Sequence, residues 1–158
     1  MIVFRIEREK YLNTALSGIG ASISEGYRWN SLNTRIVYTA DTRALATLEI
    51  SVHLDLSEDL PNDRYYVEIE IPDEIDIQEV ALEDLPDDWS SKPPTLTTQT
   101  IGDDFVNYND SAILKVPSSI VPQEFNYLIN PKHPDSSKIK ILSVSKMIFD
   151  SRLKNIKQ

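Results

Sequence analysis

Short runs with the composition of β-strands occur along the whole chain, from IVFRI near the first residue to IKILSVSKMIF near the last. The run YYVEIEIP, which starts at Tyr65, alternates apolar and polar residues and stops at Pro72, as expected for a half-buried strand. Further β-prone runs are RIVYT, AILKVPS and FNYLINP. Because these runs do not alternate regularly with helices, the pattern lacks the βαβ repeat of a doubly wound sheet and favours an α+β fold.

Helical patterns are fewer. After the β-prone run around Tyr38, Asp41 can cap a helix in which apolar residues recur on one face at the 3.6-residue period. These apolar residues are Ala44, Leu45, Leu48 and Val52. The run YLNTALSG, which ends at Gly18, predicts a helical turn or two, and IGDDFVNY predicts a short helix. The segment DLPDDWSSKPPTLTT is rich in turn residues and predicts an excursion over the surface.

The length of 158 residues is sufficient for one well-buried core and short for two, so we predict a single domain over residues 1–158. The chain has no cysteine, which fits a reducing compartment and leaves no thiolate for a metal site. No apolar run approaches the roughly 20 residues that a transmembrane helix requires. We therefore expect a soluble, cytoplasmic protein without a membrane partner.

The net charge of −9 is concentrated in one part of the chain. Between Asp55 and Asp88 lie 14 of the 25 acidic residues and one basic residue, Arg64, while the C-terminal part is basic. An acidic surface repels phosphate backbones, which disfavours direct binding of nucleic acid, although a basic protein partner could dock there. For most of these acidic residues, however, the pattern favours a solvated surface loop and strand.

Several familiar catalytic motifs are absent from the sequence. It contains no P-loop, no complete dinucleotide fingerprint, no His-Glu-x-x-His helix and no Gly-x-Ser-x-Gly elbow. With only His53 and His133 and no cysteine, we predict no metal site. A hydrolytic triad of a serine, His133 and Asp135 would require a geometry that residue types cannot establish, and a loop histidine between prolines is usually structural.

Glu49 occupies an unusual position in the predicted helix. It lies three residues before Val52, so its carboxylate is placed at the edge of the apolar face. A carboxylate there must be paired, hydrogen-bonded or facing a cleft, because an unpaired buried charge is costly. A salt bridge to Arg28 or Arg35 that only holds the helix on the sheet explains this position as well as a functional role does. By residue type alone, Arg28 fits a surface strand and Tyr38 a core position.

A series of motifs resembles the RES domain, a family named after an arginine, a glutamate and a serine that supplies the toxin half of bacterial toxin–antitoxin pairs. In order, the motifs are LSGIGA, GYRWN, VYTAD, ALATLEISVHL, QTIGDDF, VPSSIVPQEFNYLINPKHPD and FDSRL. They extend from about residue 3 to about residue 153. The resemblance implies a compact α+β fold related to ADP-ribosyltransferases, with two small, mostly antiparallel sheets around a NAD-binding cleft.

Carried over position by position, the family's functional residues fall on Arg28 of GYRWN, Tyr38 of VYT, Glu49 of the helix and Ser118 of VPS. Ser118 is chosen over the adjacent Ser119 because it directly follows Pro117. Tyr27 stands where the family usually has a second glycine, a difference that could reshape the pocket rim while leaving the arginine in place. The resemblance thus implies four catalytic residues, with Trp29 and Asn30 as neighbours that help to shape the NAD site.

The chemistry of NAD cleavage suits these residue types. Release of nicotinamide passes through an oxocarbenium-like state at the ribose, which the carboxylate of Glu49 would stabilise through the ribose hydroxyls. Arg28 would orient the pyrophosphate or ribose with its planar fork of donors, and Tyr38 would offer its ring to the cationic nicotinamide. Ser118 would contribute a hydroxyl to the ribose or a phosphate, or would position Glu49.

The resemblance therefore implies an enzyme that degrades NAD, its substrate rather than its cofactor, by hydrolysis or phosphorolysis and so arrests bacterial growth. One alternative is transfer of ADP-ribose to a cellular protein, and another is a non-catalytic module that only binds a partner. Glu68 and Glu70 form the Glu-x-Glu pattern of some protein-modifying ADP-ribosyltransferases, but both fall on the polar face of YYVEIEIP, which favours a solvated surface. The implied partner is an Xre-like helix-turn-helix antitoxin that covers the cleft and binds the DNA.

Overall fold

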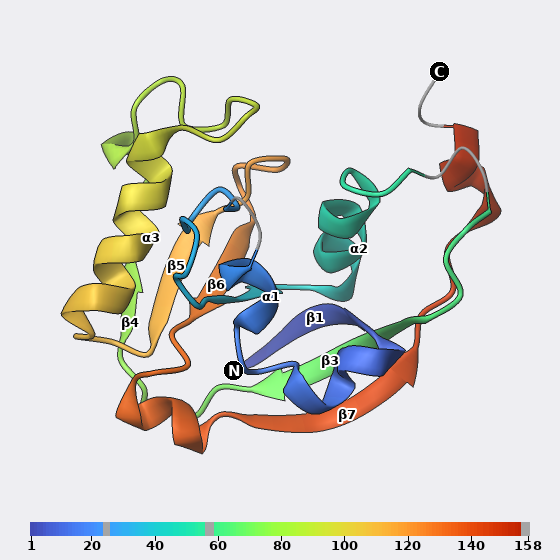
Figure 1. Cartoon of the computed structure of the whole chain (residues 1–158), viewed down its shortest axis with the longest axis horizontal. Coiled ribbons are helices and arrows are strands. Elements are labelled where there is room, and N and C mark those ends of the chain that lie inside the picture. Colours follow the sequence, from blue (N-terminus) through green and yellow to red (C-terminus); the bar gives the residue numbers. More distant parts are fainter. Residues whose placement is uncertain (24–25, 56–58, 156–158) are drawn as a thin grey trace.

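The computed structural model describes residues 1–23, 26–55 and 59–155 (Figure 1). Within these residues the strands form one mixed sheet with the order β4-β5-β6-β2-β1-β3-β7. The strands are β1 (Ile2–Arg8), β2 (Val37–Ala40), β3 (Arg64–Glu70), β4 (Ile77–Glu79), β5 (Ile113–Pro117), β6 (Phe125–Ile129) and β7 (Lys140–Lys146).

Three α-helices and four short 3-10 helices accompany the sheet in the described ranges. The α-helices are α1 (Ile19–Ser22), α2 (Arg43–Ser51) and α3 (Leu96–Tyr108). The 3-10 helices are η1 (Glu9–Thr14), η2 (Leu82–Asp84), η3 (Pro134–Lys138) and η4 (Ser151–Asn155). None of the described helices has the length and apolar content needed to cross a membrane.

The sheet narrows in its middle, between β1 and β2. These two strands share a single register pair, Phe4 with Ala40, whereas β1 pairs with β3 along its whole length, from Ile2 opposite Glu70 to Arg8 opposite Arg64. Figure 1 accordingly shows β4, β5 and β6 beside α3, and β1, β3 and β7 as a second group. The predicted α+β class is confirmed. The two small sheets expected from the resemblance are joined at this narrow point into one, in which only β4 and β5 are parallel.

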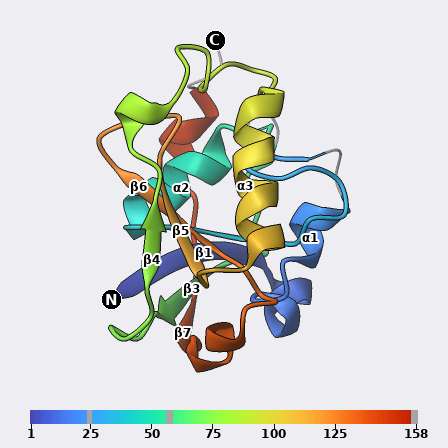
Figure 2. The ribbon, with the colours of Figure 1, turned by 90° about the vertical axis from the view of Figure 1, so that its left-hand side faces the viewer.

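Two main apolar clusters pack against the sheet, and the first of them crosses this narrow point. It joins Val3 of β1 and Val67 of β3, both fully buried, to residues of β2, β5 and β6 such as Ile129. In the second, α3 packs Phe105 and Val106 on β5 and β6, as the rotated view in Figure 2 shows for α3 beside the sheet. The first cluster therefore joins the two halves of the sheet, and the second holds α3 on β5 and β6.

Helix α2 forms where the sequence predicts it, but its cap and buried face differ from the prediction. Thr42, not Asp41, is the cap: its hydroxyl oxygen accepts a hydrogen bond from the backbone N–H of Leu45 at 3.0 Å. The helix packs on β1 and β2 through Leu45 and Ala46, which join Ala40 in a small cluster. The other residues of the predicted face, Ala44, Leu48 and Val52, are exposed. The contact between α2 and the sheet is only about one turn long. The buried part of the helix is therefore smaller than the apolar face that the sequence pattern predicts.

The turn-rich segment before α3 is anchored in the core. Trp89 is buried, and its ring centroid lies 6.3 Å from that of Trp29. Helix α3 begins at Leu96 and is capped by Thr95, so the last part of the predicted excursion is helical. The prediction of a wholly surface segment was therefore wrong at these positions.

The predicted helical turns before Gly18 are the 3-10 helix η1. Gly18 then adopts a left-handed conformation with φ 67°, and a Cβ at this position would lie 2.9 Å from the backbone nitrogen of Ile36. A side chain would be both strained and crowded there. Gly18 thus lets the chain turn tightly into α1, close to the start of β2.

Candidate active site

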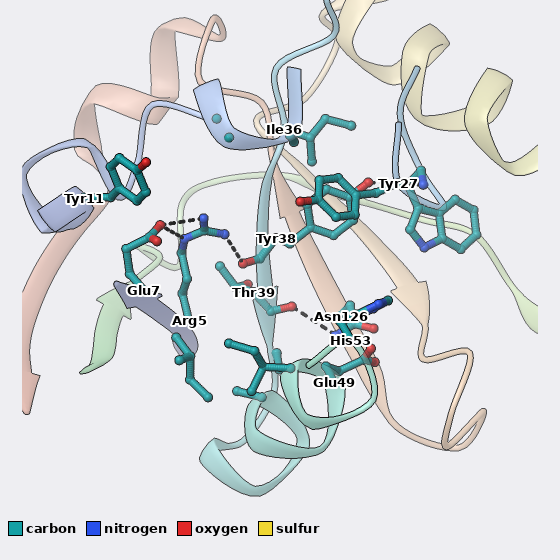
Figure 3. A pocket seen from close by; sticks show the side chains of 18 of the residues that line it. Arg5, Glu7, Tyr11, Tyr27, Ile36, Tyr38, Thr39, Glu49, His53 and Asn126 are labelled. Carbon is teal, nitrogen blue, oxygen red and sulfur yellow. Dashed lines mark hydrogen bonds and ion pairs between the residues drawn. The ribbon is translucent and has the colours of Figure 1, made fainter. Parts of the chain in front are cut away.

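A cavity of about 500 Å³ lies where β1, β2 and α2 meet (Figure 3). Residues of α1, of the segment Tyr27–Trp29 and of the loop after β5 complete its wall. Its volume is within the range of small-molecule sites in proteins. Of the residues predicted for the site, Arg28, Trp29, Tyr38 and Glu49 line this cavity, whereas Asn30 and Ser118 lie behind its wall.

Glu49 is half-buried on α2 and faces the cavity. Its Oε1 accepts a hydrogen bond from the Oγ of Ser118 at 2.7 Å. Among the described residues it forms no ion pair with Arg28 or Arg35, so the salt-bridge explanation of its position does not apply. The carboxylate is therefore held by a neutral hydroxyl donor and not by a cation.

Ser118 is fully buried at the end of β5. Its Oγ donates to Glu49 and accepts hydrogen bonds from the backbone N–H groups of Ile120 and Val121 at 3.1 and 3.2 Å. The hydroxyl is thus fixed from two directions, and its single O–H group donates to the carboxylate of Glu49. The next residue, Ser119, lines the cavity instead. Of the two roles that the sequence leaves open for Ser118, the geometry fits positioning of Glu49.

Arg28 reaches the cavity from the loop before β2. Its Nη1 donates to the carbonyl oxygens of Trp89 at 2.6 Å and Ser91 at 3.1 Å. Burial lowers the pKa of Arg28, and the nearby charge of Glu49 opposes this shift. The guanidinium is therefore held by neutral carbonyls and keeps its charge for an anionic ligand.

Tyr38 connects the cavity wall to the loop that carries Arg28. Its hydroxyl donates to the Oδ1 of Asn30 at 2.7 Å and accepts from the backbone N–H of Trp29 at 3.1 Å. Burial raises the pKa of Tyr38 well above its ordinary value, so the phenol stays protonated. The Tyr27 ring lies 5.6 Å from the Tyr38 ring at 59°. Tyr27, which stands where the RES domain usually has a glycine, thus adds a second aromatic face to the cavity.

Asn30 supports the loop rather than the ligand space. It is fully buried, and its Nδ2 donates to the carbonyl oxygens of Ala21, Ser31 and Thr34. These bonds close the loop between α1 and β2 on itself. Asn30 therefore determines where its neighbour Arg28 and the Tyr38 hydroxyl lie.

The prediction did not include several polar residues of the cavity wall, among them Arg5 and Glu7 of β1 and His53 after α2. His53 follows Glu49 by four residues, which is one helical turn, and this spacing was the available signal. Burial lowers the pKa of His53, Glu49 opposes the shift, and Lys92 and Arg28 add to it. Arg5 and Glu7 share a strand face with the buried Val3, which is an unusual place for two charges.

The residues of the rejected motifs lie elsewhere. Glu68 accepts a hydrogen bond from Arg43 at 2.5 Å, and neither Glu68 nor Glu70 lines the cavity. The Nδ1 of His133 accepts a hydrogen bond from the backbone N–H of Asp135 at 3.1 Å and caps η3. Glu68 thus takes part in an ion pair and His133 in a helix cap, and none of these residues lines the cavity.

One ligand-sized cavity contains an oriented carboxylate, a charged arginine and paired tyrosine rings. This combination is typical of an enzyme that acts on a small polar substrate. The relatives of the chain are consistent with this class. The chain matches the RES domain over residues 2–150. It therefore belongs to the RES domain family.

Curated relatives carry toxin names. The "Prs ADP-ribosylating toxin" of Sphingobium sp. (strain YBL2) is 47% identical over 140 residues, which cover 87% of this chain and 86% of the relative. A "Toxin Res" of Photorhabdus laumondii is 38% identical over 161 residues and the full length of both chains. The fold is similar to a chain in the crystal structure of the M. tuberculosis MbcT–MbcA toxin–antitoxin complex, with a TM-score of 0.75 and 14% identity over 98% of this chain and 86% of that chain.

Proposed function

We propose that the chain is the toxin of a bacterial toxin–antitoxin pair and that it cleaves the bond between nicotinamide and ribose in NAD. The observation that carries this proposal is the hydrogen bond between Ser118 and Glu49, which holds a carboxylate in a ligand-sized cavity together with Arg28 and Tyr38. The toxin names of the relatives that match across most of the chain support the same conclusion.

Glu49 would act on the ribose next to nicotinamide. As the bond from the ribose carbon to the ring nitrogen breaks, its electron pair leaves with neutral nicotinamide and positive charge develops on the ribose. A carboxylate that accepts hydrogen bonds from the ribose hydroxyls binds more strongly as this charge grows. Ser118 keeps the carboxylate in a single orientation, so little reorganisation is needed during the reaction.

Arg28, Tyr27 and Tyr38 would bind the other groups of NAD near the reacting bond. Arg28 uses Nη1 for the carbonyls of Trp89 and Ser91, and its other donors suit a pyrophosphate oxygen. The rings of Tyr27 and Tyr38 offer aromatic faces to the positively charged nicotinamide ring. This attraction disappears when neutral nicotinamide forms, which favours product release.

The acceptor of the ADP-ribosyl group distinguishes two candidate functions. With water or inorganic phosphate as acceptor, the protein degrades NAD, and this is the function that we propose. Transfer to a cellular protein is the second candidate, and it is favoured by the name of the relative that is 47% identical, an ADP-ribosylating toxin. Both candidates share the cleavage step at Glu49.

The proposed partner is an antitoxin with an Xre-like helix-turn-helix domain that covers the cavity in the cytoplasm. Support comes from the similar fold in a toxin–antitoxin complex. The excess of acidic residues in the chain favours a division of labour in which the antitoxin contacts the DNA.

The test is to incubate the purified protein with NAD, with and without inorganic phosphate, and to identify products by mass spectrometry. We expect release of nicotinamide that a Glu49→Gln variant lacks, with ADP-ribose or its phosphate as the second product. Labelled protein bands from lysate and biotinylated NAD, without bulk loss of NAD, would favour the second candidate. Growth arrest that persists in Glu49→Gln would instead indicate a non-catalytic binding protein and would refute both candidates.

A further inference from the structure

Arg5 and Glu7 form an ion pair in the cavity wall. The Nη2 and Nε of Arg5 donate to the Oε2 of Glu7 at 2.7 and 3.1 Å, and the side chains are 22% and 13% exposed. Arg5 Nη1 also donates to the carbonyl oxygen of Tyr38 at 3.1 Å. In Figure 3 the pair lies beside Tyr11, on the side of the cavity opposite Glu49 and His53.

These contacts leave capacity for a ligand. They occupy three of the five N–H donors of the Arg5 guanidinium, and no other described residue takes the remaining two. The Oε1 of Glu7 accepts one hydrogen bond, from the backbone N–H of Arg8 at 2.9 Å, and a carboxylate oxygen accepts two. The pair thus joins β1 to β2 and still presents hydrogen-bonding groups in the cavity wall.

The position of the pair matches the second half of a dinucleotide. This inference rests on the proposed function, which places the nicotinamide ribose at Glu49. The adenosine half must then extend along the same cavity, and the side away from Glu49 is lined by Arg5, Glu7 and Tyr11. Tyr11 is 47% exposed there and offers an aromatic face to a base.

We propose that Glu7 makes the site selective for NAD over NADP by accepting a hydrogen bond from the 2′-hydroxyl of the adenosine ribose. NADP carries a phosphate of about −1.5 to −2 charge at that hydroxyl. Such a phosphate can donate no hydrogen bond when ionised, and the carboxylate of Glu7 repels it. Carboxylates read the same hydroxyl in dinucleotide-binding folds of a different architecture.

Two of the cations near Glu7 already pair with carboxylates, while the Nζ of a third, Lys10, lies 4.7 Å from the centroid of the Tyr11 ring. Arg5 is neutralised by Glu7 itself, and the Nε of Arg8 pairs with the Oδ2 of Asp63 at 3.0 Å. Among the described residues, Arg5 and Arg8 are the cations in the cavity wall on β1. A 2′-phosphate near Glu7 would therefore share each arginine with a carboxylate that already pairs with it, which weakens its attraction to these cations.

The test compares cleavage of NAD and NADP by the wild-type protein, Glu7→Gln and a control, Glu9→Gln. Glu9 lies two residues further along, is exposed, and does not line the cavity, so its substitution makes the same change in net charge outside the site. We expect kcat/KM of the wild type to be higher for NAD by about tenfold or more. Glu7→Gln should reduce this ratio at least about threefold, and Glu9→Gln should leave it unchanged. Glu7→Asp, which keeps the charge, should preserve the preference if Glu7→Gln does not fold.

Equal cleavage of NAD and NADP by the wild type, or an undiminished preference in a folded Glu7→Gln protein, would overturn the inference. Binding of ADP and of adenosine 2′,5′-bisphosphate, measured by calorimetry, provides a readout without catalysis. Tighter binding of ADP that depends on Glu7 supports the inference even if neither dinucleotide is cleaved, a result that would refute only the proposed function. Equal binding of the two fragments to the wild type would contradict a role of Glu7 in the selectivity for NAD.

Discussion

Ser118 and Glu49 are 69 residues apart in the sequence, yet the hydroxyl of one donates to the carboxylate of the other at 2.7 Å. The serine comes from the end of β5 in one half of the sheet, and the glutamate from α2, which packs on β1 and β2. The bond therefore fixes the carboxylate relative to both halves. Its removal should disturb the chemistry more than the binding of substrate.

Ser118→Ala should lower kcat for nicotinamide release by about 10- to 100-fold and change KM little, because a displaced carboxylate loses its alignment with the ribose. It should also destabilise the protein by about 1–2 kcal/mol, since the backbone N–H groups of Ile120 and Val121 lose their acceptor. Steady-state kinetics and chemical denaturation measure the two effects. Ser119→Ala, which alters the cavity wall without touching Glu49, is the control. A rise in KM at unchanged kcat would contradict a positioning role.

Glu49→Gln should reduce nicotinamide release by about 100- to 1,000-fold, the usual loss when one electrostatic contact to the transition state is removed. The amide oxygen still accepts from Ser118, so the free energy of unfolding should change by about 1 kcal/mol or less. Glu70→Gln makes the same chemical change on β3, outside the cavity, and should leave the rate unaltered. If the Glu70 variant lost activity and the Glu49 variant kept it, the Glu-x-Glu pattern would be the functional one.

The Tyr38→Phe variant tests the contribution of the hydroxyl separately from that of the ring. The variant leaves the backbone N–H of Trp29 and the Oδ1 of Asn30 without their partner, so we expect a loss of about 1–3 kcal/mol in the free energy of unfolding. The ring remains available to nicotinamide, and turnover by the folded fraction should persist. Tyr108→Phe, at an exposed position of α3, should be neutral in the same denaturation experiment. Equal stability of the two variants would show that the hydroxyl contributes nothing to the loop.

The sequence pattern was informative wherever a local rule decides the structure. The alternation around Val67 and Ile69 predicted β3, because each second residue of a half-buried strand must be apolar. The position of Glu49 at the edge of an apolar helix face predicted a carboxylate in need of a partner. Its partner could not be found in the same way, since the pairing with Ser118 depends on how β5 and α2 meet.

Predictions failed where neighbouring residues have equivalent local chemistry or where a distant contact decides. Asp41 and Thr42 can both cap a helix by residue type, and in the structure Thr42 has the extended backbone and the hydrogen bond of the cap. Trp89 lies in a turn-rich segment but is buried by Trp29, a contact between residues far apart in the sequence. Arg5 was not predicted for the site, because its charge suggests a solvated position when the cavity wall around it is not known.

His53 should make the stability of the protein depend on pH. Its pKa in the folded state is lowered from 6.5, first by burial, so the unfolded chain binds the proton more strongly. The histidine therefore costs no stability above pH 6.5, and stability is lost as pH falls from 6.5 to the lowered folded-state pKa. Subtracting the unfolding free energies of a His53→Gln variant from those of the wild type between pH 5 and about 8 isolates this effect. A difference that is flat across this range, or that grows more favourable toward low pH, would contradict the assigned direction.

Gly102 allows α3 to pack directly on the loop that carries Arg28. A Cβ at this position would overlap the carbonyl oxygen of Trp29, a backbone atom that cannot rotate away. Gly102→Ala should therefore lose more than about 3 kcal/mol of stability, whereas Gly20→Ala in α1, where nothing lies within 4 Å, should be neutral or gain about 0.4–1 kcal/mol. Thermal and chemical denaturation of the pair measure this contrast. Because relief of the overlap must displace Trp29 and the adjacent Arg28, any folded Gly102→Ala protein should also have a raised KM for NAD. A variant with wild-type stability and KM would show that the helix and the loop are not in contact as described.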